Sequence, residues 1–209
     1  MKNHDMEIPG PAKERLLYLL KLLEKGGSAT LTSAHIESLT GWSRDSIRKD
    51  ISYLAADLGR ASGYDGAALK NAIKKTLRLD RKQKVCIVGL GRLGSAYLNF
   101  GDFQHGEFEL TAGFDANVNR VEILSSPVPL YPTYKMNEVI NRFAIEISLL
   151  CVPEDQAQLV ADKLIAAGIR GIVNFAPVVL KIPSDIAVRN VYIVDELRSL
   201  SIRIHSKNA

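Results

Sequence analysis

Hydrophobic positions divide the chain into two parts with different periodicity. In the first eighty residues, leucine and isoleucine recur at intervals of three and four, which is typical of amphipathic helices. From Val85 onward, short continuous apolar runs alternate with helical patterns. Such runs are typical of parallel strands that are buried on both faces and joined by helices. The pattern therefore predicts a small helical domain followed by an α/β domain.

We expect four helices in the helical part. The third should begin after Ser43, a good N-cap residue, and it has two chemically different faces. Ile47, Ile51 and Leu54 are spaced to lie on one face, where they would be buried. The other three helices are expected over residues 11–25, from Thr32 or Ser33 to residue 40, and around Leu69, Ile73 and Leu77.

The outer face of the third helix is basic and polar. Two short helices joined at Gly41, the second with such a face, match a helix-turn-helix motif whose recognition helix enters the major groove of DNA. A solvated amphipathic helix without any ligand would show the same pattern, so both interpretations stay open at this point. The candidate DNA contacts on this helix are Arg44, Ser46, Arg48, Lys49 and Ser52.

A turn bracketed by Gly59 and Gly63 follows, with Arg60 near its tip. A cation on such a turn is expected of a wing that reaches the minor groove, so Arg60 is a sixth candidate contact. Charge supports this prediction: residues 1–84 carry 16 Lys and Arg against 10 Asp and Glu, whereas the rest carries 11 against 13. We therefore expect a winged-helix DNA-binding domain over residues 1–80.

The strand expected at 85–88 leads directly into Gly89-Leu90-Gly91-Arg92-Leu93-Gly94. This G-x-G-x-x-G motif has the context of a dinucleotide site, with a strand before it, a helix after it and a second strand over 108–114. The strand ends at Asp115, 21 residues after Gly94, where an acidic side chain can bind a ribose 2′-hydroxyl group. The motif predicts a Rossmann domain over residues 85–193 that binds NAD(H), although nearby Arg120 could accept the 2′-phosphate of NADP.

More strands of the same sheet are expected over 145–152, 171–175 and 188–193. In such sheets the ligand lies at the carboxyl ends of the strands, on the glycine motif and on the residues that follow each strand. The candidate cofactor contacts are therefore Gly89, Gly91, Arg92, Leu93, Gly94, Asp115, Val152, Pro153, Asn174, Ala176 and Pro177.

The last predicted helix, over about 194–204, carries Leu197, Leu200 and Ile204 in one stripe. It follows the end of the sheet, so the stripe either packs on its own sheet or crosses to a second subunit. The second alternative suits a two-fold symmetric reader of palindromic DNA. We assign residues 194–209 to a dimerisation helix and tail.

No pattern of catalytic or metal-binding residues is found in the sequence. His105 lies near Glu107 and His35 lies alone, and neither belongs to an acid–base group. Cys86 and Cys151 lie in apolar runs without zinc-type spacing, and a disulfide is not expected. No apolar run is long enough to cross a membrane, and the N-terminus lacks a signal-peptide pattern. We expect a cytoplasmic protein that is not an enzyme.

Taken together, these motifs resemble the Rex family of bacterial redox-sensing transcriptional repressors. The resemblance implies a homodimer with a winged helix, a Rossmann domain and an exchanged C-terminal helix. It also implies that NAD⁺ permits binding to a double-stranded DNA operator and that NADH closes the dimer and releases the DNA. The segments that carry the resemblance are 8–9, 47–53, 63–64, 88–96, 168–178, 188–191 and 196–201.

Residues of the DNA-binding part and of the cofactor-binding part depart from the pattern that the resemblance implies. In the first part these are Lys21, Asp45, Ser46 and the segment 58–61, and in the second part there are three. Phe100 stands where a tyrosine is expected, Tyr192 where an aspartate is expected, and Ile193 where an aromatic residue near the nicotinamide is expected. Phenylalanine cannot donate the hydrogen bond of a tyrosine. Two alternatives therefore stay open: a divergent paralogue that binds DNA with a weakened or lost NADH response, and a small nucleotide-dependent enzyme or CoA-binding module.

Overall fold

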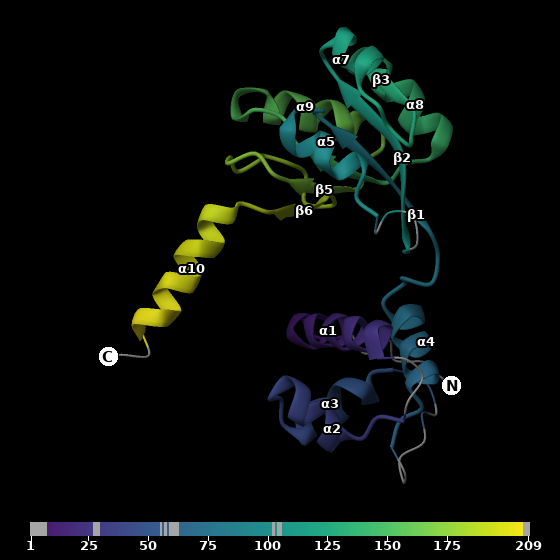
Figure 1. Ribbon diagram of the computed structural model, residues 1–209, viewed down its shortest axis with the longest axis vertical. Coiled ribbons are helices and arrows are strands. Elements are labelled where there is room, and N and C mark those ends of the chain that lie inside the picture. The colour runs from purple at the N-terminus through teal and green to yellow at the C-terminus, as the bar shows by residue number, and fades with distance from the viewer. Residues whose placement is uncertain are drawn as a thin grey trace. The chain divides into compact units, whose positions relative to one another are not determined.

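The computed structural model describes residues 8–26, 30–54, 56, 58, 63–101, 103 and 106–206. The chain forms two compact units, residues 1–81 and 82–209, and each is described here by itself. Figure 1 shows a helical unit and a unit built around a sheet, as the periodicity of the sequence predicts.

In its described residues, the N-terminal unit packs four helices around one apolar core. Leucines of α1 occupy the core together with Ile36 of α2, Ile47 and Ile51 of α3, and Leu69 and Ile73 of α4. Side chains at intervals of three and four meet on one face of each helix, and this explains why the periodicity located all four helices. The helices span α1 Gly10–Gly26, α2 Ser33–Thr40, α3 Arg44–Ser52 and α4 Gly66–Thr76.

A six-stranded sheet forms the centre of the second unit. Its strand order is β3-β2-β1-β4-β5-β6, with every neighbouring pair parallel. This order reverses direction between β1 and β4, which is the position where dinucleotide-binding sheets place their ligand. The strands are β1 Gln83–Val88, β2 Phe108–Asp115, β3 Leu130–Pro132, β4 Ile147–Leu150, β5 Gly171–Asn174 and β6 Ala187–Asn190.

Helices cover both faces of the sheet (Figure 1). Cys86 and Val88 of β1 point into a core that includes residues of α8 and α9, whereas Val85 and Ile87 point into a second core that includes Leu98 of α5. The alternation follows from the two-residue period of a strand. The helices of this unit are α5 Arg92–Leu98, α7 Val118–Ile123, α8 Met136–Phe143, α9 Glu154–Ala166 and α10 Ile193–Ser206, with a 3₁₀ turn at Thr133–Lys135.

Two strand predictions were wrong at their ends. The strand expected over 145–152 spans only Ile147–Leu150, and the one expected over 188–193 spans Ala187–Asn190. Ile193 is instead the first residue of α10. An apolar run can extend past the end of a strand because residues next to the strand also enter the core, as Ile145 does just before β4. Within the described part of the chain, no helix combines the length and the apolar character that crossing a bilayer requires.

Candidate functional sites

The candidate recognition helix, α3, begins at a side-chain cap. The hydroxyl oxygen of Ser43 accepts a hydrogen bond from the backbone N–H of Ser46 at 3.3 Å, and its O–H donates to the Ser46 hydroxyl at 2.9 Å. Gly41 separates α3 from α2 with a φ of 73°, a left-handed conformation that glycine adopts at low cost. The two helices and this turn form the helix-turn-helix that the sequence predicts.

A partly buried ion pair joins α3 to α1. Arg15 donates from Nε to Oδ2 of Asp50 at 2.6 Å and from Nη2 to Oδ1 at 2.8 Å. The Asp50 side chain is only 6% exposed, so it depends on this partner for compensation of its charge. The hydrogen bond to the Asp50 carboxylate raises the pKa of Arg15 above its ordinary value. The pair lies on the side of α3 that faces the core of the unit, so the opposite side of the helix faces solvent.

The structure presents four of the five candidate residues of α3 to solvent. Arg44, Arg48, Lys49 and Ser52 are exposed, whereas Ser46 is half-buried and its hydroxyl is engaged by Ser43. Arg44 pairs through Nε with Glu37 of α2 at 2.7 Å, and Arg48 lies 3.6 Å from Asp45. The sequence did not reveal that Arg44 links the two helices.

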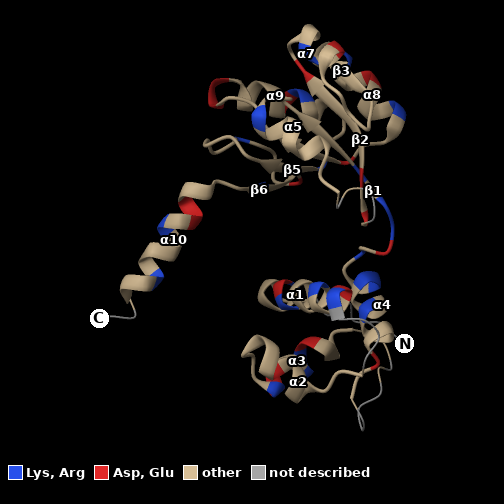
Figure 2. Cartoon of the chain, in the orientation of Figure 1, with Lys and Arg blue, Asp and Glu red and all other residues tan. Residues whose placement is uncertain are grey.

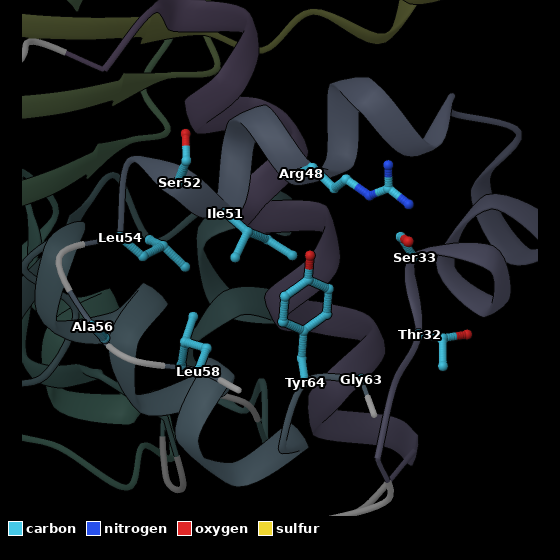
Figure 3. A pocket seen from close by; sticks show the side chains of 10 residues that line it. All are labelled: Thr32, Ser33, Arg48, Ile51, Ser52, Leu54, Ala56, Leu58, Gly63 and Tyr64. Carbon is cyan, nitrogen blue, oxygen red and sulfur yellow. The ribbon is translucent and has the colours of Figure 1, made fainter. Parts of the chain in front are cut away.

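A cavity of about 420 Å³ adjoins α3. Figure 3 shows the Tyr64 ring between the apolar side chains of Leu54 and Leu58 and the polar side chains of Thr32 and Ser33. Tyr64 forms an antiparallel bridge with Leu31, with N–H to O distances of 2.8 and 2.7 Å, so the chain returns to the helices directly after the predicted wing. Arg60, the candidate at the tip of that wing, lies outside the described residues.

Positive charge in the N-terminal unit extends beyond α3. Figure 2 shows Lys and Arg on α4 and on the segment that leads into β1, which includes Arg81 and Lys82. Lys74 of α4 is paired with Glu24 of α1 at 2.8 Å, so part of this charge is neutralised within the unit.

In the second unit, each of the three glycines of the motif is required for a different structural reason. Gly89 has a φ of 90°, and a Cβ there would lie 2.4 Å from the carbonyl oxygen of Cys151. A Cβ on Gly94 would lie 1.8 Å from the carbonyl oxygen of Gly89, so this position needs glycine for close packing of helix and strand. Beside Gly91 a Cβ would meet nothing within 4 Å. The backbone at Gly91 therefore faces open space, as an approaching pyrophosphate requires.

Asp115 stands at the end of β2, beside the glycine loop. Its Oδ2 accepts from the backbone N–H of Leu90 at 2.7 Å and from Nη1 of Arg120 at 3.0 Å, and its Oδ1 accepts from the N–H of Asn117 at 2.8 Å. The side chain is 7% exposed. Asp115 thus anchors the glycine loop, a role that the sequence alone did not reveal.

The candidates after β4 and β5 lie at the carboxyl edge of the sheet, close in the fold to the glycine loop. Val152 approaches Gly89, since its Cγ1 would lie 2.9 Å from a Cβ placed there, and Pro153 is the N-cap residue of α9. Asn174 is buried, with its Nδ2 donating to the carbonyl oxygen of Val178 at 2.9 Å and its Oδ1 accepting from Ala176 N–H at 3.0 Å. Its side chain therefore shapes the turn through Ala176 and Pro177.

Both cysteines are unpaired thiols. Burial raises the pKa of Cys86 and of Cys151 to about 12 from the ordinary 9.0. A thiol with such a pKa holds almost no thiolate at neutral pH, so neither is suited to redox chemistry there. In the described part of the chain, no cluster of His, Cys, Asp and Glu could hold a metal ion.

The apolar stripe of α10 is uncovered. None of the residues in α10 is buried, and Leu197, Leu200 and Ile204 are each more than half exposed. The alternative in which the stripe packs on its own sheet is therefore wrong. Ile193 is exposed on the same face, because the spacings of four, three and four follow the helical repeat.

Comparison with known proteins places these two units in one family. A family model described as CoA binding domain matches residues 80–178, the segment that contains strands β1 to β5. The redox-sensing transcriptional repressor Rex of Levilactobacillus brevis is 34% identical over 199 residues, which cover 94% of this chain and 94% of the relative. The chain belongs to the Rex family of redox-sensing transcriptional repressors. Rex proteins are regulators, which excludes the enzyme alternative.

Solved Rex structures match the fold along the whole chain. RSP, a Rex-family repressor solved in complex with β-NAD⁺ and operator DNA, is 31% identical, with a TM-score of 0.82 and coverage of 100% of this chain and 95% of that one. The complex of RSP with β-NADH has a TM-score of 0.81 at 30% identity and covers 97% of each chain. The fold prediction of a winged helix followed by a Rossmann domain is confirmed.

Proposed function

We propose that this protein is a transcriptional repressor whose affinity for operator DNA responds to the ratio of NADH to NAD⁺. The observation that carries the proposal is the match, over the whole chain, to a Rex-family repressor solved with β-NAD⁺ and operator DNA. The match includes both the unit with the exposed cations of α3 and the unit with the glycine loop.

The glycine loop fits a dinucleotide. The open space beside Gly91 admits a pyrophosphate to the backbone, while Gly89 and Gly94 hold the loop close to β4 and to itself. Leu93 and Arg92 are exposed at the start of α5, and Val152 and Pro153 follow β4 at the adjoining edge of the sheet. These residues would hold the dinucleotide, and Asn174 would maintain the turn at Ala176 and Pro177. The bound coenzyme supplies a nicotinamide that is positively charged only when oxidised.

The proposed DNA contacts lie on α3 and, at Arg60, on the predicted wing. Arg48 and Lys49 are exposed on α3 and would bind phosphates or base edges, as would Arg44 and Ser52. Arg60 would extend the contact into the minor groove. Ser46 would act chiefly through the cap, because its hydroxyl is engaged by Ser43.

We also propose a homodimer that acts on palindromic DNA in the cytoplasm. The exposed stripe of α10 supports this part, since three apolar side chains in water are costly and a second copy offers a matching stripe. The domain limits in this proposal are residues 1–80 for DNA binding, 85–193 for NAD(H) binding, and 194–209 for dimerisation.

One observation favours a second candidate, a paralogue with a weakened NADH response. Phe100 follows α5, its side chain is 48% exposed, and its ring contacts Tyr97 and Phe103 edge to face at centroid distances of 6.2 and 5.9 Å. It offers no hydroxyl to transmit the state of the coenzyme. Tyr192 and Ile193, at the start of α10, are the other two departures.

The test uses a labelled duplex selected from a random-sequence pool by the full-length protein with NAD⁺. NADH and NAD⁺ are titrated separately while fluorescence anisotropy reports DNA binding. We expect NADH to release the duplex and NAD⁺ to leave it bound. Equal binding with both coenzymes would support the paralogue, and failure to select any duplex would overturn the proposal.

A further inference from the structure

The corner of the sheet at the end of β2 carries two opposite charges with different exposure. The Asp115 side chain is 7% exposed, whereas the Arg120 side chain is 45% exposed. In Rossmann domains this corner meets the adenosine ribose, where an acidic residue selects a free 2′-hydroxyl group and an arginine accommodates a 2′-phosphate. The group that this chain presents to an incoming ribose is therefore mainly the guanidinium.

The Asp115 carboxylate has little capacity left for a ligand. A carboxylate offers about four lone-pair positions. Three of them are used by Leu90 N–H, Asn117 N–H and Arg120 Nη1, at 2.7, 2.8 and 3.0 Å. One position on Oδ1 remains on a nearly buried side chain, which makes Asp115 a weak acceptor for a ribose hydroxyl group.

Arg120 has the opposite balance. A guanidinium carries five N–H donors, and the contact with Asp115 uses Nη1. The backbone of Arg120 is fixed as well, because its N–H donates to Oδ1 of Asn117 at 3.2 Å. The backbone of the arginine is therefore held in place, while its side chain is 45% exposed and has donors that the contact with Asp115 does not use.

The ion pair also removes the electrostatic reason for rejecting a 2′-phosphate. An unpaired aspartate repels the phosphate, but a guanidinium nitrogen 3.0 Å from Oδ2 cancels that charge, and the exposed donors attract the phosphate. We propose that Arg120 determines nucleotide selectivity in this protein and allows NADPH to bind at the same site as NADH. This inference rests on the proposed function, since it concerns the coenzyme of the same site.

The experiment measures the affinities of the full-length protein for NADH and for NADPH by coenzyme fluorescence. For the unmodified protein we expect the two dissociation constants to differ by about tenfold or less. Arg120→Ala should weaken NADPH binding by about 10-fold to 100-fold, the effect of losing a charge-assisted hydrogen bond. NADH binding should change by about threefold or less, and Arg120→Lys should fall between because it keeps the charge but loses the planar fork.

Arg142→Ala is the matched control. Arg142 lies at the end of α8, over the ring of Phe143 and before β4, so it belongs to the amino edge of the sheet, away from the glycine loop. Its removal should leave the ratio of the two affinities unchanged. Retained NADH binding in Arg120→Ala serves as the check that the variant is folded.

Three results would overturn the inference: an unmodified protein that rejects NADPH strongly, an affinity ratio that Arg120→Ala does not alter, or an equal loss of both coenzymes in that variant. Each of these still leaves NADH binding in the unmodified protein. If the unmodified protein binds neither coenzyme, the proposed function fails and the inference fails with it.

Discussion

Arg15 of α1 and Asp50 of α3 meet through two parallel hydrogen bonds although 35 positions separate them in the sequence. Asp50 shares the buried face of α3 with Ile47 and Ile51. A fork-shaped guanidinium fixes the orientation of a carboxylate more strictly than apolar contacts can. The pair therefore sets how α3 is rotated about its axis, and with it the direction of Arg48 and Lys49.

Arg15→Ala should destabilise the N-terminal unit, because it leaves the Asp50 carboxylate buried without a partner. We expect a loss of about 2 to 3 kcal/mol, below the range for fully buried pairs because the Arg15 side chain is 32% exposed. Urea unfolding followed by fluorescence reports on this unit, since the one tryptophan, Trp42, is partly buried and packs against its core.

Arg44→Ala is the control for this prediction, because the Arg44–Glu37 pair is largely exposed. It should cost about 1 kcal/mol or less. If both variants lose the same stability, Arg15 has no special part in the unit.

Arg48→Ala should lower the salt dependence of DNA binding. Each phosphate contact releases about one counterion, so the slope of log K against log salt should decrease by about 0.9. Anisotropy titrations at several salt concentrations measure the slope, with the exposed Lys163 of α9 changed to Ala as the control. A slope equal to that of the unmodified protein would show that Arg48 does not contact phosphate.

Asp115→Ala should loosen the glycine loop, because the N–H groups of Leu90 and Asn117 lose their acceptor. Each buried group left unsatisfied costs about 1 to 3 kcal/mol. We expect lower thermal stability together with weaker NADH binding, measured by calorimetry. The exposed Asp195, which pairs with Arg198 on α10, provides the control Asp195→Ala. Unchanged stability would contradict the anchoring role.

Alkaline pH should destabilise the protein through Cys86. Burial raises the pKa of this thiol to about 12, whereas the unfolded thiol titrates near 9.0. Above pH 9 the folded state therefore holds more protons than the unfolded state, and the free energy of unfolding falls as pH rises. The Cys86 contribution should decrease by about 1.4 kcal/mol between about pH 8 and pH 10.

The measurement compares urea unfolding of the unmodified protein and of Cys86→Ala at the two pH values. Removing the buried side chain costs stability at both pH values, but the titration of Cys151 is common to both proteins and only the unmodified protein carries the titration of Cys86. The gap between the two proteins should therefore narrow at the higher pH. A constant gap would contradict the pKa shift.

Changing Leu197 and Leu200 together to serine should separate the proposed dimer. Both side chains are more than half exposed on α10, so their loss leaves the protomer itself intact. Sedimentation velocity should show a smaller species, while Ser199→Asp, a change at an exposed serine between them, should leave the assembly unchanged. A double variant that sediments like the unmodified protein would exclude this stripe as the interface.

The sequence predicted the elements whose signals are local. Helical spacing located α1 to α4, and Ser43 marked the start of α3. The glycine motif located the turn after β1 because Gly89 and Gly94 serve contacts close in the sequence. The elements α7, β3 and α8, which follow Asp115, were not predicted. β3 has only three residues, too few for a period to show.

The roles of single side chains were harder to predict. Asp115 and Asn174 were expected to face a ligand. Asp115 instead accepts from the backbone N–H groups of Leu90 in the glycine loop and of Asn117, and Asn174 accepts from the N–H of Ala176 in the turn that follows it. The sequence cannot reveal this, because the same residue type can accept a hydrogen bond from a ribose or from a backbone N–H group. Arg15 gave no signal either, since its partner is distant in the sequence.

Because the apolar stripe of α10 is exposed, the fraction of the protein that is dimeric would depend on its concentration in the cell. In the proposed dimer, two protomers would cover each other's exposed leucines, and dilution would favour the monomer. In a cell that made very few copies, most of them would be monomers. Each monomer would carry only half of the symmetric DNA-binding surface of the proposed dimer. At the lowest levels, the concentration of dimer, and with it the degree of repression, would then rise roughly as the square of the protein concentration.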